Sequence, residues 1–214
     1  ERLLEPVTWF VILLGQFLFD FVTGNSNDVA VGYPDDDRKK IANNLFYNTY
    51  LRLPKPLRTA LLTPNSEDVL GKAYRNDDGE IQTLNNIHFA TLNKRPGAFR
   101  MLRLKRVLMD EAGLYNNLEG AVNATLDCVR IGEYQFGQII IGGTSDAIDN
   151  SSTDYRVLYF NPKPYHAVSY FIPDSKILHP HIDYNTGKSD EIKATEAINK
   201  KAEELKQTNL KAYY

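Results

Sequence analysis

The segment at residues 179–183 contains the side chains best suited to metal chemistry. It reads His-Pro-His-Ile-Asp, with His179 and His181 two residues apart and Asp183 two residues further on. On an extended segment, side chains two residues apart point the same way, so the imidazoles and the carboxylate would share one side. Such groups are ligands for zinc or iron. One hypothesis is therefore a metal-dependent hydrolase that uses His179, His181 and Asp183 with a divalent metal ion as cofactor.

Other features of the chain favour a loop without any cofactor. A catalytic metal needs a further ligand, for which His88, His166 and Asp174 are the available sources, and no pattern indicates that they converge. Cys128 is the only cysteine, which excludes a thiolate cluster and an intramolecular disulfide. Its apolar neighbours predict a buried packing residue.

Residues 139–146 resemble a strand that leads into a glycine turn. They read Ile-Ile-Ile-Gly-Gly-Thr-Ser-Asp, and free N–H groups in such a turn could hold an anion. The segment lacks the lysine of a phosphate-binding loop, and residues 147–153 are mostly turn formers. We therefore expect an ordinary loop between strands at this point.

Basic residues gather between Lys94 and Arg106. In a helix, the spacing of Arg100, Arg103 and Arg106 would place three guanidinium groups along one face. Such a face could contact anionic lipid head groups or an acidic partner, or it could simply be solvated. Nucleic acid is disfavoured as a partner because the formal net charge of the chain is −2.

Residues 7–22 are apolar on every helical face, which is the strongest pattern in the chain. The pattern predicts a helix that inserts into a membrane, and an uncleaved signal-like segment is a further alternative. Arg2 precedes the run and Arg38 is the next basic residue after it, which favours a body on the exported side. If the helix is instead the core of a soluble binding module, neighbouring protein covers it. The candidate membrane or partner contacts comprise Trp9, Phe10, Phe17, Phe19, Arg100, Arg103 and Arg106.

The remaining patterns predict an α+β fold. Asp35 begins a helix that ends near Leu53, and Asp78-Gly79 is typical of a tight turn in a hairpin over residues 69–84. Further helices are expected at 97–112, 117–128 and 189–207, and a strand at 86–92. Strands at 129–141, 155–161 and 165–172 predict an antiparallel sheet packed by helices. Residues 1–24 would form the anchor helix, 25–34 a linker, 35–187 the domain, and 188–214 the C-terminal helix and tail.

These observations lead to one preferred hypothesis about function. Attachment features outnumber catalytic groupings, so the sequence favours a membrane-associated structural or assembly subunit over an enzyme. Its expected partners are other protein subunits or a second copy of the chain, together with membrane lipid. The metal-dependent hydrolase and the soluble binding module remain the alternatives.

Overall fold

The computed structural model describes residues 15, 19, 28–58, 68–143, 153–170, 179–183 and 185–208. These residues divide into a larger unit that extends to Ala167 and a smaller unit that begins at Val168. The larger unit contains the sheet and the site described below.

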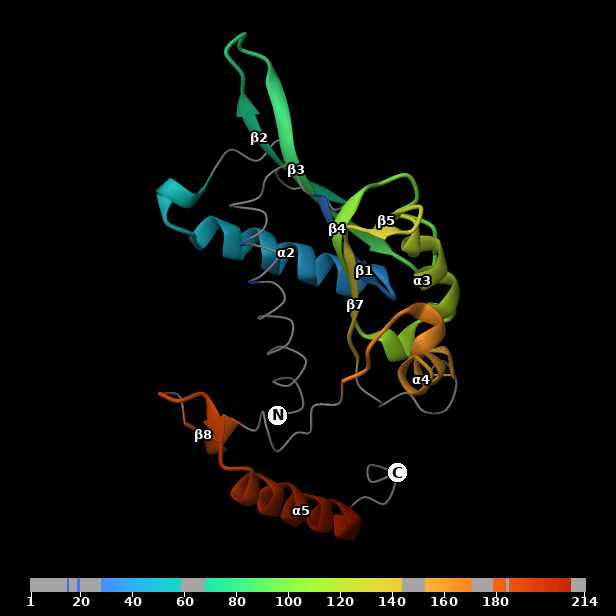
Figure 1. Ribbon diagram of the computed structural model, residues 1–214. Helices are drawn as coiled ribbons and strands as arrows, with labels where there is room; N and C mark the ends of the chain where they lie inside the picture. Colours follow the sequence, from blue (N-terminus) through green and yellow to red (C-terminus); the bar gives the residue numbers. More distant parts are fainter. Residues whose placement is uncertain are drawn as a thin grey trace. The chain divides into compact units, whose positions relative to one another are not determined.

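A mostly parallel five-stranded sheet is the centre of the larger unit (Figure 1). Its spatial order is β2-β3-β1-β4-β7, and only β2 runs antiparallel to its neighbour. The long β3 lets the β2–β3 hairpin extend beyond the neighbouring strands (Figure 1). The strands are β1 (Asp28–Tyr33), β2 (Val69–Arg75), β3 (Ile81–Thr91), β4 (Leu104–Met109) and β7 (Gln138–Ile141).

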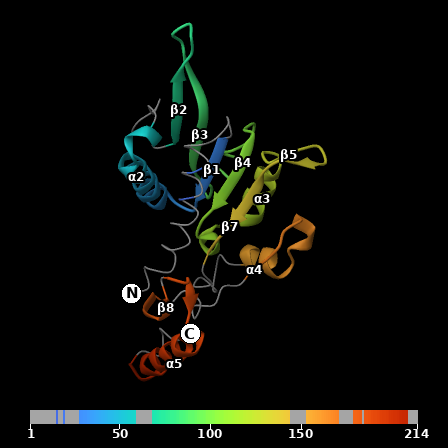
Figure 2. The same cartoon turned by 60° about the vertical axis from the view of Figure 1, so that its left-hand side comes forward.

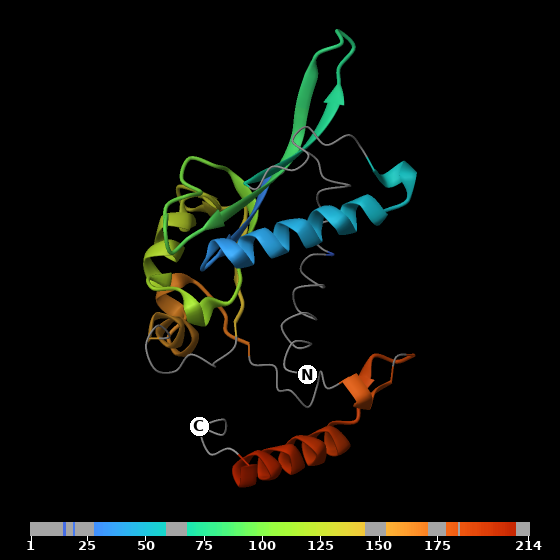
Figure 3. The same cartoon turned by 180° about the vertical axis from the view of Figure 1, so that it is seen from behind.

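Helices cover both faces of this sheet (Figures 2 and 3). Helix α2 (Asp36–Arg52) contributes Phe46 and Tyr50 to a cluster that includes Val29 and Val31 of β1. On the other face, α3 (Leu118–Leu126) packs in a cluster with Ala30 of β1. Because side chains alternate along a strand, β1 is buried on both faces, as expected for a strand in the middle of a parallel sheet.

The start of α2 is specified locally, and its prediction is confirmed. Asp35 accepts a hydrogen bond from the backbone N–H of Arg38 at 2.9 Å, which caps the helix. Asp36 and Asp37 follow in the first turn, where carboxylates oppose the helix dipole. The chain leaves the helix at Leu53, directly before Pro54.

The other elements of the larger unit are short. Strands β5 (Arg130–Ile131) and β6 (Tyr134–Gln135) form a separate two-stranded antiparallel sheet. Helix α4 (Thr153–Phe160) follows β7 in the described chain. The 3₁₀ helices are η1 (Lys55–Leu57), η2 (Ala112–Leu114) and η3 (Lys163–Tyr165).

The smaller unit contains η5 (His179–His181), β8 (Ile182–Asp183), β9 (Lys188–Ser189) and α5 (Glu191–Thr208). The antiparallel pair β8–β9 precedes α5, so the predicted C-terminal helix is confirmed. The hairpin predicted around Asp78-Gly79 is confirmed as well. Gly79 has a φ of +83°, the left-handed conformation that glycine adopts most readily.

The predicted antiparallel sheet is wrong, because the fold is mixed α/β with a mostly parallel sheet. Of the region 129–141, only residues 138–141 join the main sheet, and residues 153–160 form α4 where a strand was expected. The apolar run of β7 pairs in parallel with β4 and does not form a meander. Residues 28–33, expected in a linker, form the buried strand β1.

The helix predicted over residues 97–112 is also absent. Residues 104–109 form β4, which pairs with β1 on one side and β7 on the other. The i, i+3 spacing of the arginines indicated a helix, but burial of Val107, Leu108 and Met109 between two strands decides the conformation. The predicted helix at 117–128 is confirmed as α3.

The predicted N-terminal helix at residues 7–22 lies outside the described residues, except for Gly15 and Phe19, which are helical. The expected membrane localisation is corrected, because in the described part of the chain no helix is long and apolar enough to cross a bilayer. The division into 1–24, 35–187 and 188–214 stays a prediction, whereas the expected linker 25–34 contains the strand β1.

Gly137, just before β7, allows a close approach that a larger residue would disrupt. A Cβ atom at this position would lie 2.2 Å from the backbone oxygen of Leu104. We expect Gly137→Ala to lower the free energy of unfolding by about 2 kcal/mol, because β4 and β7 must separate. Urea denaturation measures the change. Gly142→Ala is the control, since its Cβ would meet no atom within 4 Å; equal losses in both variants would contradict this account.

Candidate functional site

The carboxyl ends of the parallel strands meet at one edge of the sheet. The chain leaves β1 toward β3 on one side, whereas it leaves β4 toward β7 on the other. The neighbouring strands β1 and β4 therefore form a topological switch point, the place where open α/β sheets bind ligands. The residues that follow these two strands are the first candidates for a site.

An acidic pair, Asp110 and Glu111, directly follows β4 at this switch point. The backbone N–H of Asp110 donates to the Gly32 carbonyl oxygen at 3.1 Å, which ties the pair to β1. The backbone N–H of Glu111 donates to Asp110 Oδ1 at 2.9 Å. Glu111 has a φ of +51°, a left-handed conformation that is uncommon outside glycine and often marks functional sites.

Burial, with a smaller contribution from the neighbouring Glu111 charge, raises the pKa of the Asp110 carboxyl to about 6. The hydrogen bond from the Glu111 N–H and the charge of Arg38 oppose this effect. A carboxylate that is desolvated in this way is a strong ligand for a cation, because a cation supplies the charge that solvent no longer balances.

Arg38, in the first turn of α2, contacts carboxylates from two elements. Its Nη1 pairs with Asp35 Oδ2 and its Nε pairs with Glu111 Oε2. Burial lowers the pKa of Arg38, but the hydrogen bond to Asp35 and the charges of Glu111 and Asp35 outweigh this effect and raise the pKa. The guanidinium thus bridges the residues that follow β1 and β4.

Two buried phenols lie near the acidic pair. Tyr33 at the end of β1 and Tyr115 after η2 are 2% and 0% exposed. Burial raises the pKa of each well above its ordinary value, and the charges of Asp110 and Glu111 add to the effect. Both phenols therefore stay neutral. Their buried rings lower the polarity of the surroundings of the acidic pair, which strengthens electrostatic interactions there.

The glycine turn after β7 is held against the residues that follow Glu111. The backbone N–H of Ala112 donates to the Gly142 carbonyl oxygen at 2.8 Å. The backbone N–H of Gly142 donates to the Met109 carbonyl oxygen at 2.9 Å. A Cβ on Gly143 would lie 2.7 Å from the Ala112 nitrogen. The hydroxyl of Tyr155 on α4 donates to the Gly143 carbonyl oxygen at 3.1 Å. Residues 144–146 of this predicted loop lie outside the described residues.

The predicted metal ligands lie in the smaller unit. His179 and His181 bound the short helix η5, and Asp183 ends β8. The Asp183 carboxylate accepts hydrogen bonds from Asn185 N–H at 2.9 Å and Thr186 Oγ1 at 2.8 Å. Across the described ranges, no three His, Cys, Asp or Glu side chains gather as a metal site. A metal at His179, His181 and Asp183 stays a prediction.

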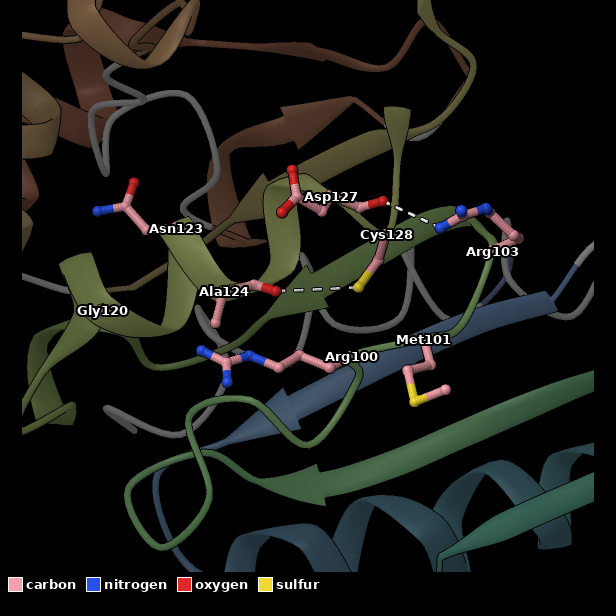
Figure 4. A pocket seen from close by; sticks show the side chains of 8 residues that line it. All are labelled: Arg100, Met101, Arg103, Gly120, Asn123, Ala124, Asp127 and Cys128. Atoms are coloured by element: carbon pink, nitrogen blue, oxygen red, sulfur yellow. Dashed lines mark hydrogen bonds between the residues drawn. The ribbon is translucent and has the colours of Figure 1, made fainter. Parts of the chain in front are cut away.

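The basic segment lines a shallow cavity of about 460 Å³ (Figure 4). Arg100 and Arg103 line it and are exposed, while Arg106 is half-buried on β4, so the three do not share a helical face. Arg103 donates to the Asp127 carbonyl oxygen at 3.3 Å. Cys128 is 1% exposed and donates to the Phe99 carbonyl oxygen at 2.9 Å, so its predicted burial is confirmed.

Of the four predicted aromatic contact residues, only Phe19 belongs to the described part of the chain. Trp9, Phe10 and Phe17 lie outside the described residues, and Phe19 is 64% exposed. Contact of the seven residues with a partner stays a prediction, as does the expectation of protein subunits or a second copy as partners. The expectation against nucleic acid has no support, since Arg100 and Arg103 are both exposed.

The residues at the switch point were not selected from the sequence. In the helix expected at 97–112, Asp110 and Glu111 would be ordinary charges in the last turn. The signal that could have identified them is the apolar run Val107-Leu108-Met109 followed at once by two acidic residues. Such a run is typical of a buried parallel strand whose next residues reach the ligand-binding edge of a sheet.

No protein-family model matches the sequence, and no curated protein matches it. Among solved structures, the chain is similar to the large terminase ATPase domain of a Thermus phage, with a TM-score of 0.45 and 14% identity. A mutant form of that domain gives a TM-score of 0.48 and 13% identity. Each comparison covers 63% of this chain and 54% of the terminase chain, and we transfer no residue role from it.

The expected membrane-anchored structural subunit is corrected. The single-pass membrane helix on which the expectation depended is not found in the described part of the chain.

Asp110 should reduce the stability of the fold when it is charged. Its folded pKa of about 6 lies above the ordinary value of 3.8, so unfolding releases a proton between these values and the native state loses stability as pH rises through them. Asp110→Asn removes this penalty, which is up to about 3 kcal/mol above pH 6. Urea denaturation should show a stabilised variant at pH 8 and a smaller advantage at pH 5. An advantage that is equal at both values would contradict the raised pKa.

Proposed function

We propose that the chain hydrolyses a nucleoside triphosphate with Mg²⁺ at the switch point between β1 and β4. The observation that carries this proposal is the acidic pair Asp110-Glu111, placed directly after a central parallel strand. Open α/β sheets bind nucleotides at such points, and a carboxylate that follows a buried strand holds Mg²⁺ in many nucleotide hydrolases.

The residues present fit a magnesium ion. Mg²⁺ is bound through one or two carboxylates together with substrate phosphates and water, so a cage of three protein ligands is not required. Asp110 Oδ1 accepts the Glu111 N–H, which fixes the carboxylate while its second oxygen remains for a cation. Its desolvation favours a charged partner. When bound, the ion would neutralise the charge that develops on the phosphate oxygens.

Glu111 is the proposed general base. Its carboxylate takes a proton from water while the water oxygen forms a bond to the terminal phosphorus. The bond between that phosphorus and the bridging oxygen breaks, so the products are a nucleoside diphosphate and inorganic phosphate. The left-handed backbone of Glu111 turns the chain directly after Asp110, which lets adjacent carboxylates take different roles.

The environment of the pair supports this division of roles. Asp110 is half-buried beside two neutral phenols, where a bound cation acts strongly. Glu111 is held by Arg38, and its side chain is 37% exposed. Desolvation thus acts on the Asp110 carboxyl, as suits a metal ligand, whereas the partly exposed Glu111 side chain can reach water.

Glu111→Gln should lower the kcat for MgATP hydrolysis by at least about 100-fold, because the amide cannot accept the proton. The affinity for nucleotide should change less than about threefold, because the fold and Asp110 are intact. Phosphate release measures turnover, and equilibrium dialysis with labelled ATP measures binding.

Glu80→Gln is the matched control, since Glu80 is an exposed carboxylate in the β2–β3 hairpin, and it should hydrolyse ATP at the wild-type rate. Undiminished turnover in Glu111→Gln, or a wild-type chain that binds no MgATP, would refute the proposed function.

A further inference from the structure

Arg38 joins two elements that are far apart in the sequence. Asp35, which caps α2, contacts its Nη1, and Glu111, which follows β4, contacts its Nε. All three side chains are partly exposed, between 37% and 42%. The guanidinium therefore spans the switch point from the helix that follows β1 to the acidic pair.

A cation is unfavourable in the first turn of a helix, where the dipole leaves positive partial charge. Its presence there requires compensation by nearby carboxylates. Asp36 is already engaged by Thr91 and Lys94, so Arg38 depends on Asp35 and Glu111. The two contacts are made by different edges of a planar guanidinium, which fixes the direction of both carboxylates in a way that a lysine cannot.

Glu111 needs such a restraint more than most glutamates do. Its Oε2 atom is buried without a hydrogen bond of ordinary geometry and is compensated by the ion pair with Arg38 Nε, although the side chain as a whole is partly exposed. A glutamate side chain has three rotatable bonds, so an unrestrained carboxylate would populate several orientations. A general base works only within hydrogen-bond reach of the attacking water.

We propose that Arg38 is the positioning residue for Glu111, and that Asp35 anchors Arg38 in this role. The guanidinium holds the Glu111 carboxylate beside the carboxyl ends of β1 and β4, in an orientation in which it can receive the proton of water. This inference rests on the proposed nucleotide hydrolysis and adds a residue, from a different element, that acts through the base.

The two possible roles of Arg38 affect different kinetic constants. A guanidinium that bound the phosphates of the substrate would act mainly on KM, whereas one that orients the base acts on kcat. The proposal therefore predicts a separation between the two constants that a purely structural role would not produce.

Turnover of MgATP by the full chain tests this separation. Arg38→Ala should lower kcat at least about 10-fold with KM within twofold, because the base loses its orientation. Arg38→Lys should recover part of the loss, since an ammonium can pair with one carboxylate. Asp35→Asn should fall between Arg38→Ala and the wild type, because asparagine keeps the helix cap and loses the charge. Lys40→Ala, an exposed cation on the same helix, should match the wild type.

An unchanged kcat in Arg38→Ala, or a loss confined to KM, would overturn the positioning role. A second measurement does not depend on turnover. In the nucleotide-free protein, the Nε–Hε resonance of Arg38 should shift in Glu111→Ala and stay in place in Asp36→Ala. If the wild type fails to hydrolyse ATP, the proposed function fails, and this resonance still decides the contact. A resonance that Glu111→Ala leaves unmoved overturns the inference.

Discussion

The parallel pairing of β4 with β1 and β7 is the constraint from which the site follows. A strand paired on both sides and buried on both faces has a fixed direction and register, so the residues after it emerge at a fixed point. For β4 these residues are Asp110 and Glu111. The apolar run that makes β4 a central strand thus also determines where the acidic pair lies.

The different surroundings of the two carboxylates follow from this placement. Asp110 continues the direction of β4 and remains beside Tyr33, whereas the left-handed backbone of Glu111 turns the chain away. The same turn brings Ala112 against the glycine turn after β7. The ends of β1, β4 and β7 therefore all contact residues 110–112. Arg38 connects the start of α2 to the same segment through Glu111.

Local signals in the sequence specify some elements, and contacts between distant segments specify the others. Helix α2 could be predicted because Asp35 caps it, and the β2–β3 hairpin because Gly79 supplies its turn. The order of the sheet could not, because the pairing of β1 with β4 leaves no local pattern. The spacing of Arg100, Arg103 and Arg106 indicated a helix where burial produces a strand. Because of this expected helix, the position of the acidic pair after a central strand could not be predicted. The contact of Glu111 with Arg38 could not be predicted either.

A paramagnetic ion tests the location of the site most directly. Mn²⁺ can replace Mg²⁺ with ATP, and it broadens the NMR signals of nuclei close to it. We predict that Mn²⁺ with ATP broadens the backbone amide resonances of Gly32, Asp110 and Glu111, and spares those at the tip of the β2–β3 hairpin around Gly79. Broadening centred on His179 and His181, or no selective broadening at the end of β4, would contradict the central claim.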